Sequence, residues 1–164
     1  MTANELFAET GDAYLTLVHL ENGVEDDVAT ISSVSETCSS QLIDQLLRDG
    51  DSWRERLTGL VIASIRDIKE YYDSLLCGFQ RTGGISIVPM SAAISVAVRD
   101  RECKYDPQMT ESLDRDSWDG EIGFALDWLH HTIGMGDAPE RTVGPNYGQE
   151  FNKHLEFYTT LNGA

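Results

Sequence analysis

The chain has 164 residues, and its 28 Asp and Glu outnumber its 12 Lys and Arg, which gives a formal net charge of −16 at pH 7. Residues 1–51 hold eleven acidic and one basic residue, 52–104 hold six and eight, and 105–164 hold eleven and three, so these segments carry −10, +2 and −8. A protein that binds nucleic acid needs a basic surface that displaces counterions. This distribution therefore excludes nucleic acid as a direct partner and favours a cationic protein.

Length and cysteine usage narrow the class further. A chain of this size buries enough apolar surface to fold as one domain, 1–164, without a metal or a disulfide. Cys38, Cys77 and Cys103 are widely spaced, which predicts reduced thiols. The N-terminus lacks the pattern of a secretory signal, and no apolar run approaches the roughly 18 residues of a membrane span. We therefore expect a soluble, cytoplasmic protein with no membrane partner.

Residues 1–35 have the least defined pattern. The segment 13–20, AYLTLVHL, precedes Asn22-Gly23, which is typical of a strand that enters a tight turn. A helix that is broken at Gly11 also fits the apolar residues of this region. Both alternatives stay open, and we prefer the helix.

Helix signals are clearer from residue 39 onward. Ser39 or Ser40 can cap a helix with apolar residues at three- and four-residue spacing. The next helix is predicted over 52–66, where Ser52 and Glu55 have the spacing of a capping box. Both segments therefore predict helices whose first residues follow a serine N-cap.

Four more segments complete the expected elements. Helices are predicted over 67–81, 89–101, 119–134 and 149–161, from their apolar stripes and from the glycine and proline residues at their ends. The polar segment 102–120 is expected to be a loop that contains one helical turn near its middle.

Successive amphipathic helices joined by short turns pack as antiparallel pairs. The predicted fold class is all-α, either a bundle or a short HEAT-like stack of helix pairs. Basic residues of the middle segment are expected to organise this fold through ion pairs with the acidic ends. The side chains expected in the core are Trp53, Leu57, Leu60, Val61, Ile68, Leu75, Leu76, Ile94, Leu126 and Leu129.

Catalytic motifs are weak in this sequence. Asp127 and His131 share a helix face at i, i+4, and a metal site there needs a third ligand such as Glu121 or His154. An ordinary, partly exposed histidine pair explains the same pattern, so we expect no cofactor and no catalytic residue. A metal-dependent enzyme that uses Glu121, Asp127 and His131 remains the alternative.

One resemblance bears on function. The segment WRERLTGLVIASIRD, followed by IKEYYDSLLCGF and a helix of small residues, resembles the acidic HEAT-like helical immunity proteins of bacterial polymorphic toxin systems. The resemblance covers roughly 40–133 and rests on architecture and on the Trp-Arg-x-Arg-Leu helix opening. It implies a stoichiometric inhibitor that masks the active surface of a toxin and performs no catalysis.

The expected function is therefore that of an acidic binding protein with a basic protein partner, a toxin being one such partner. Carboxylates in loops can contact a partner without disturbing the core. Trp118 is expected either to anchor that interface or to cap the helix that begins near Gly120. The candidate binding residues are Asp114, Asp116, Trp118, Asp119, Glu121, Glu25, Asp26 and Asp27.

A third hypothesis is an oligomeric helical regulatory protein, although the sequence leaves the oligomeric state undetermined. Its subunit interface would consist of exposed aromatic residues near the C-terminus. These residues are Tyr147, Phe151, Phe157 and Tyr158.

Overall fold

The computed structural model describes residues 1–50, 52–82, 84–99, 103–139 and 147–163. Throughout these ranges the regular secondary structure is helical, which confirms the predicted all-α class. The α-helices are α1 (Ala3–Thr10), α2 (Val24–Ser35), α3 (Ser40–Arg48), α4 (Trp53–Arg66), α5 (Tyr72–Phe79), α6 (Ile87–Arg99), α7 (Glu121–Thr132) and α8 (Tyr147–Asn162). Short 3-10 helices are η1 (Thr16–Val18), η2 (Ile68–Tyr71), η3 (Gly84–Ser86) and η4 (Pro107–Thr110).

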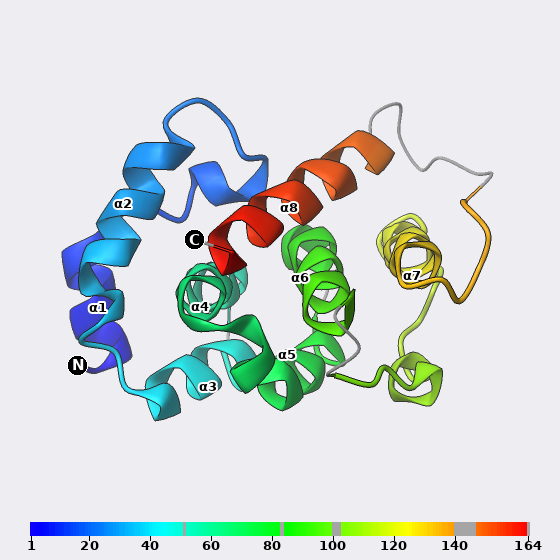
Figure 1. The fold of residues 1–164 in the computed structure, drawn as a ribbon, viewed down its shortest axis with the longest axis horizontal. Coiled ribbons are helices and arrows are strands. Elements are labelled where there is room, and N and C mark those ends of the chain that lie inside the picture. The colour runs from blue at the N-terminus through cyan, green and yellow to red at the C-terminus, as the bar shows by residue number, and fades with distance from the viewer. Residues whose placement is uncertain (51, 83, 100–102, 140–146, 164) are drawn as a thin grey trace.

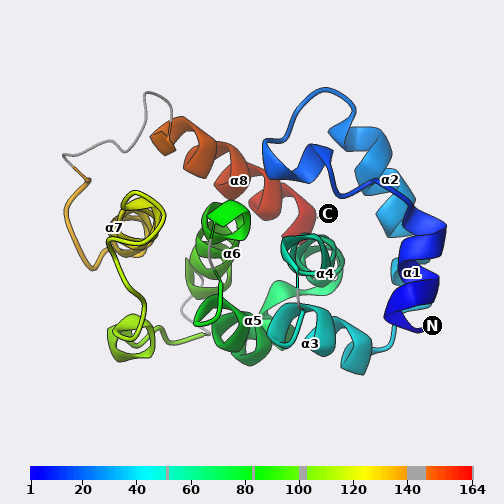
Figure 2. The same cartoon turned by 180° about the vertical axis from the view of Figure 1, so that it is seen from behind.

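The helices pack as a bundle around α4 and α6, which lie at the centre (Figure 1). The last helix, α8, crosses both of them on one side, and α3 and α5 lie on the opposite side. The view from behind shows α1 and α2 at one end of the long axis and α7 at the other (Figure 2). Contacts of α8 with α4 and α6 join segments far apart in the sequence, which favours a closed bundle over a linear stack.

Helix starts follow the expected capping chemistry. The Ser39 hydroxyl accepts a hydrogen bond from the Leu42 amide at the start of α3. At α4, the Ser52 hydroxyl accepts from the Glu55 amide while the Glu55 carboxylate accepts from the Ser52 amide. Such reciprocal bonds satisfy amides that the first helical turn leaves without partners.

Three segments differ from expectation. Residues 13–20 form turns and η1, which is neither the α-helix that we preferred nor the alternative strand. The break expected at Gly11 is present, because α1 ends there and Gly11 adopts φ of 54°. The helix expected over 67–81 begins as η2, because the Asp67 carboxylate accepts from the Lys69 amide and caps a tighter turn. The 12-residue helix α2 was not anticipated.

The core is close to the predicted one. Apart from Trp53, which is half-buried and packs edge-on against Tyr14, every expected core residue is buried. No disulfide joins Cys38, Cys77 and Cys103, all of which lie in the described ranges. Cys38 is buried, and Cys77 and Cys103 are partly buried. No helix in the described ranges is both long and apolar enough to cross a bilayer.

Basic residues of the middle segment contact the N-terminal region through an ion pair, through aromatic rings and through backbone carbonyls. Arg81 pairs with Asp49 at 3.2 Å, as expected. The Arg54 guanidinium instead lies over the rings of Phe7 and Tyr14, at 5.1 and 5.3 Å from their centroids. Arginine is suited to such stacking because its guanidinium is planar and weakly hydrated.

Arg66 attaches the end of α2 to α4. Its Nη2 donates to the carbonyl oxygens of Ser35 and Cys38, both at 2.6 Å. The Ser35 carbonyl lies at the C-terminal end of α2, where the helix dipole favours a cation, and Cys38 follows in the turn between α2 and α3.

Replacing Arg66 with Met should lower the free energy of unfolding by about 2 kcal/mol, because two carbonyl oxygens lose a charged donor. Urea denaturation monitored by circular dichroism measures the change. The matched control is Arg48→Met, which removes an exposed arginine from the last turn of α3. It should change stability by no more than about 0.5 kcal/mol. If both variants lost the same free energy of unfolding, the hydrogen bonds from Arg66 to the two carbonyl oxygens would not stabilise the fold.

Candidate functional site

The segment before α7 contains most of the predicted binding residues and has a defined internal structure. The Asp114 carboxylate accepts from the Ser117 hydroxyl at 2.6 Å and from the Asp116 amide at 3.2 Å. The Ser117 hydroxyl and then the Asp116 amide hold the pKa of Asp114 below its ordinary value. Asp114 therefore organises this loop, and its carboxylate is already engaged.

Arg115 fastens the same loop to α7. Its Nη2 donates to the Gly123 carbonyl oxygen at 3.2 Å and pairs with the Asp127 carboxylate. The Gly123 amide donates to the Arg115 carbonyl oxygen at 3.1 Å. A Cβ at Gly123 would lie only 2.8 Å from that oxygen, so the loop approaches α7 as closely as a glycine allows.

Trp118 lies at the tip of the loop, with 61% of its surface exposed. Trp118 and Asp119 adopt φ values of 57° and 53°, a left-handed conformation that non-glycine residues rarely adopt. The six-membered ring of the indole lies against Gly84, where a Cβ would be 3.0 Å from two ring carbons. The ring is therefore supported by the start of η3 and still presents much of its surface to solvent.

Ile85, next to Gly84, is 47% exposed. It is therefore a second exposed apolar side chain, adjacent in sequence to the glycine that supports the indole, and Asp116 and Asp119 on either side of Trp118 in the loop are exposed as well. Neither of these two carboxylates has a hydrogen bond or ion pair with any residue in the described ranges. We call Trp118, Ile85, Asp116 and Asp119 the Trp118 patch.

Trp118 contributes its backbone carbonyl, and not its side chain, to the start of α7. Gly120 is the N-cap of α7, with φ of 85°, and the Trp118 carbonyl accepts from the Glu121 amide at 3.0 Å. Glu121 is half-buried in the first turn of α7, and its carbonyl oxygen accepts from the Tyr147 hydroxyl at 3.1 Å. Glu121 therefore lies at the junction of α7 and α8 rather than at the tip of the loop.

The second group of predicted carboxylates is elsewhere. Glu25, Asp26 and Asp27 form the first turn of α2, and Asp27 accepts from the Thr16 hydroxyl at 2.6 Å. Acidic residues in a first turn stabilise the helix dipole. Because α2 and α7 lie at opposite ends of the bundle (Figure 1), one compact interface cannot include both acidic groups.

The residues of the alternative metal site are engaged in other contacts. Asp127 pairs with Arg115, and the His131 Nδ1 lies 3.4 Å from the Gly136 carbonyl oxygen. His154 is buried and donates from Nε2 to the Val18 carbonyl oxygen at 3.1 Å. Across the described residues, no three His, Cys, Asp or Glu side chains are grouped so that they could hold a metal ion.

Sequence reasoning missed a polar cluster beneath α7. The Tyr105 hydroxyl lies 2.9 Å from the Thr110 hydroxyl and 3.1 Å from the His130 Nε2. Burial, reinforced by the charge of Arg115, lowers the pKa of His130 and favours the neutral imidazole. Tyr105 is distant from α7 in the sequence, so no local spacing pointed to this cluster, which joins the preceding loop to the helix.

The aromatic residues of α8 do not form an exposed interface. Phe151 and Tyr158 are fully buried, and Tyr147 and Phe157 are half-buried. Phe151 stacks on Trp128 of α7, with ring centroids 5.7 Å apart. The expected oligomer surface was therefore wrong, because these rings pack against the rest of the bundle.

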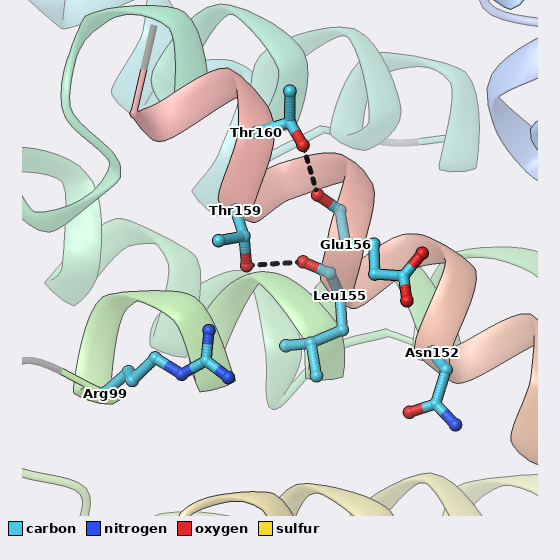
Figure 3. Close-up of a pocket in the computed structure, with 6 residues that line it drawn as sticks. All are labelled: Arg99, Asn152, Leu155, Glu156, Thr159 and Thr160. Atoms are coloured by element: carbon cyan, nitrogen blue, oxygen red, sulfur yellow. Dashed lines mark hydrogen bonds between the residues drawn. The ribbon is translucent and has the colours of Figure 1, made fainter.

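A hollow of about 430 Å³ lies on α8 beside the end of α6 (Figure 3). Arg99 has no hydrogen bond or ion pair to the described part of the chain, and Glu156 lies on the same hollow. The hydroxyls of Thr159 and Thr160 donate to carbonyl oxygens of their own helix. This open hollow therefore presents one cation and one carboxylate to solvent.

Comparisons with protein-family models, with curated proteins and with solved structures gave no significant match for this chain.

Proposed function

We propose that this chain is a non-catalytic acidic binding protein that inhibits a basic protein, such as a toxin, by stoichiometric binding in the cytoplasm of a bacterial cell. The observation that carries the proposal is the Trp118 patch. It combines a supported, exposed indole with two carboxylates that have no partner among the described residues. Interfaces commonly centre on an aromatic residue of this kind with polar residues around it.

The net charge of −16 supports a basic partner. A surface of one sign attracts an oppositely charged protein over about 8–10 Å at physiological ionic strength and raises the association rate. The loop is also suited to rigid recognition, because Asp114, Arg115 and Gly84 each fix part of it before any partner binds. A preformed loop loses less conformational entropy when it binds.

Capture from an extract of the source cell tests the proposal. The immobilised protein should retain a basic protein at about 50 mM salt and release most of it at about 500 mM, because salt screens the attraction. The double variant Asp116→Asn/Asp119→Asn should retain much less of that protein. Glu25→Gln/Asp26→Asn is the charge-matched control, since it removes the same charge at the other end of the bundle, and it should retain nearly as much as the wild type.

Stoichiometric inhibition is tested with the captured partner after purification. Its activity should fall linearly as the chain is added and reach its minimum at one equivalent. An acidic partner, or retention that neither salt nor the Asp116/Asp119 change affects, would contradict the proposal. If both double variants retained equally less of the basic protein, binding would depend on the overall negative charge of the chain, and the Trp118 patch would not be the binding site.

A further inference from the structure

We propose that the Trp118 patch binds an arginine side chain of the basic partner, in preference to lysine, with the guanidinium stacked on the indole and neutralised by Asp116 and Asp119. This inference rests on the proposed function and specifies the chemistry of its partner.

The first argument is the exposed surface of the indole. Trp118 is the most exposed of the large apolar side chains found exposed in the described ranges, at 61%, and Ile85 beside Gly84 adds a further apolar side chain at 47%. Tryptophan offers the strongest aromatic surface for a cation. If the partner contributed only an apolar side chain, Asp116 and Asp119 would have no counter-charge in the complex. A cationic side chain can contact the indole and also neutralise these carboxylates.

The second argument is that the indole is held in place before binding. Gly84 has φ of 56°, and a side chain at this position would meet three carbons of the Trp118 ring within 3.3 Å. Two successive non-glycine residues, Trp118 and Asp119, keep left-handed conformations, and the Asp114 carboxylate ties down the start of the loop. The loop and the indole therefore lose little conformational entropy when a partner stacks on the ring.

The third argument distinguishes arginine from lysine. A guanidinium is planar, weakly hydrated and able to stack on a ring while its N–H groups donate to carboxylates at the edge. A lysine ammonium is a strongly hydrated point charge and loses more solvation on an aromatic surface. This chain already contains such stacking, since the Arg54 guanidinium lies over Phe7 and Tyr14.

A second copy of the same chain is a poor occupant of the patch. Each copy carries a formal charge of −16, so two copies repel one another unless a basic region meets the patch. An acidic peptide would be repelled by Asp116 and Asp119 in the same way. Charge complementarity therefore selects a basic segment, and the aromatic surface selects its arginine.

The test compares two probes, a tetra-arginine amide and a tetra-lysine amide, by isothermal titration calorimetry at about 50 mM salt. The arginine peptide should bind the wild-type chain at least about threefold more tightly than the lysine peptide, as expected for one exposed cation–π contact. Trp118→Leu should weaken binding of the arginine peptide by the same factor and leave the lysine peptide within twofold. Trp118→Phe keeps a flat ring and should retain part of the preference.

Two further variants separate the contributions. Asp116→Asn/Asp119→Asn should lower the affinity for both peptides by similar factors, because it removes negative charge and leaves the indole ring in place. Leu15→Ala is the control for loss of an exposed apolar side chain, since Leu15 is 53% exposed in the N-terminal region, and it should leave both affinities unchanged. Thermal melts of every variant establish that the bundle is intact.

Equal affinity for the two peptides, or a preference that survives Trp118→Leu in a folded protein, would overturn the inference. So would a wild-type chain that binds neither peptide. These results are distinct from failure of the proposed function, which is measured by capture of the basic partner and by its inhibition.

Discussion

Replacing Gly78 with Ala should destabilise the bundle by at least about 3 kcal/mol, or prevent folding altogether. Gly78 lies in α5 where that helix crosses α3, and a Cβ there would be 1.9 Å from the Leu47 carbonyl oxygen and 2.9 Å from the Leu47 carbonyl carbon. Both of these atoms belong to the backbone of α3, so no side-chain rotation can relieve the overlap. The two helices must separate, which breaks packing around buried residues on both.

Urea denaturation of wild-type and variant proteins measures this effect. Gly136→Ala is the control, because a Cβ at Gly136 would lie 3.6 Å from the His130 Cβ, an ordinary contact distance. It should shift the free energy of unfolding by no more than about 0.5 kcal/mol. Similar unfolding midpoints for Gly78→Ala and the wild type would mean that α3 and α5 are not packed this closely.

The second large effect is a loss of stability in mild acid, caused by His154. This imidazole is buried between α8 and the loop that contains η1, and its Nε2 donates to the Val18 carbonyl oxygen. Burial lowers the pKa of His154 from 6.5 to about 4, although the bond to Val18 and the charge of Glu150 oppose the change. The folded protein therefore keeps His154 neutral in a range where the unfolded chain binds a proton.

The direction of the pH dependence follows from this difference. Because the folded pKa is lowered, the unfolded state binds more protons between pH 6.5 and 4, and stability falls as the pH falls. The full loss is about 3 kcal/mol at 1.4 kcal/mol per pKa unit. Glu5 and Asp114, whose pKa values are also lowered, lose their contributions only at lower pH, near and below the ordinary values of carboxyl groups. His130, whose pKa is also lowered by burial, adds to the loss in the same direction below its ordinary value of 6.5, so the His154 contribution is the part that a variant at position 154 removes.

Urea denaturation at pH 7, 6 and 5 follows the effect of His154 with little interference from these carboxylates. His154→Gln keeps a neutral donor of similar reach, and its stability should depend less steeply on pH over this range. An identical slope in the variant and the wild type would show that His154 does not carry the pH dependence.

The parts of the fold that could be predicted are those specified by local chemistry. The capping box of Ser52 and Glu55 and the cap at Ser39 each required only residues within one turn. In contrast, α2 contains Ser, Thr and Val, which favour helices only weakly, and its start lacks a side-chain cap because Gly23 occupies the N-cap position. The apolar spacing of Val24, Val28 and Ile31 was the signal that could have found it.

The candidate site could be predicted only in outline. The sequence placed Trp118 and its neighbouring aspartates in a loop before a helix, and the structure does the same. It did not indicate that the indole would lie on Gly84, because Gly84 is at the start of η3, far from Trp118 in the sequence, and the two are brought together by the packing of α6 against α7. Nor could composition distinguish Asp114, which is engaged within the loop, from the exposed Asp116 and Asp119.

Hydrogen–deuterium exchange of the chain, alone and saturated with its captured basic partner, tests most directly whether the Trp118 patch is the binding surface. Slower exchange should be confined mainly to peptides that cover 114–120 and 84–86, while the first turn of α2 at the other end of the bundle exchanges as before. Unchanged exchange at 114–120 in a saturated complex, with protection at α2 or elsewhere, would contradict binding through Trp118.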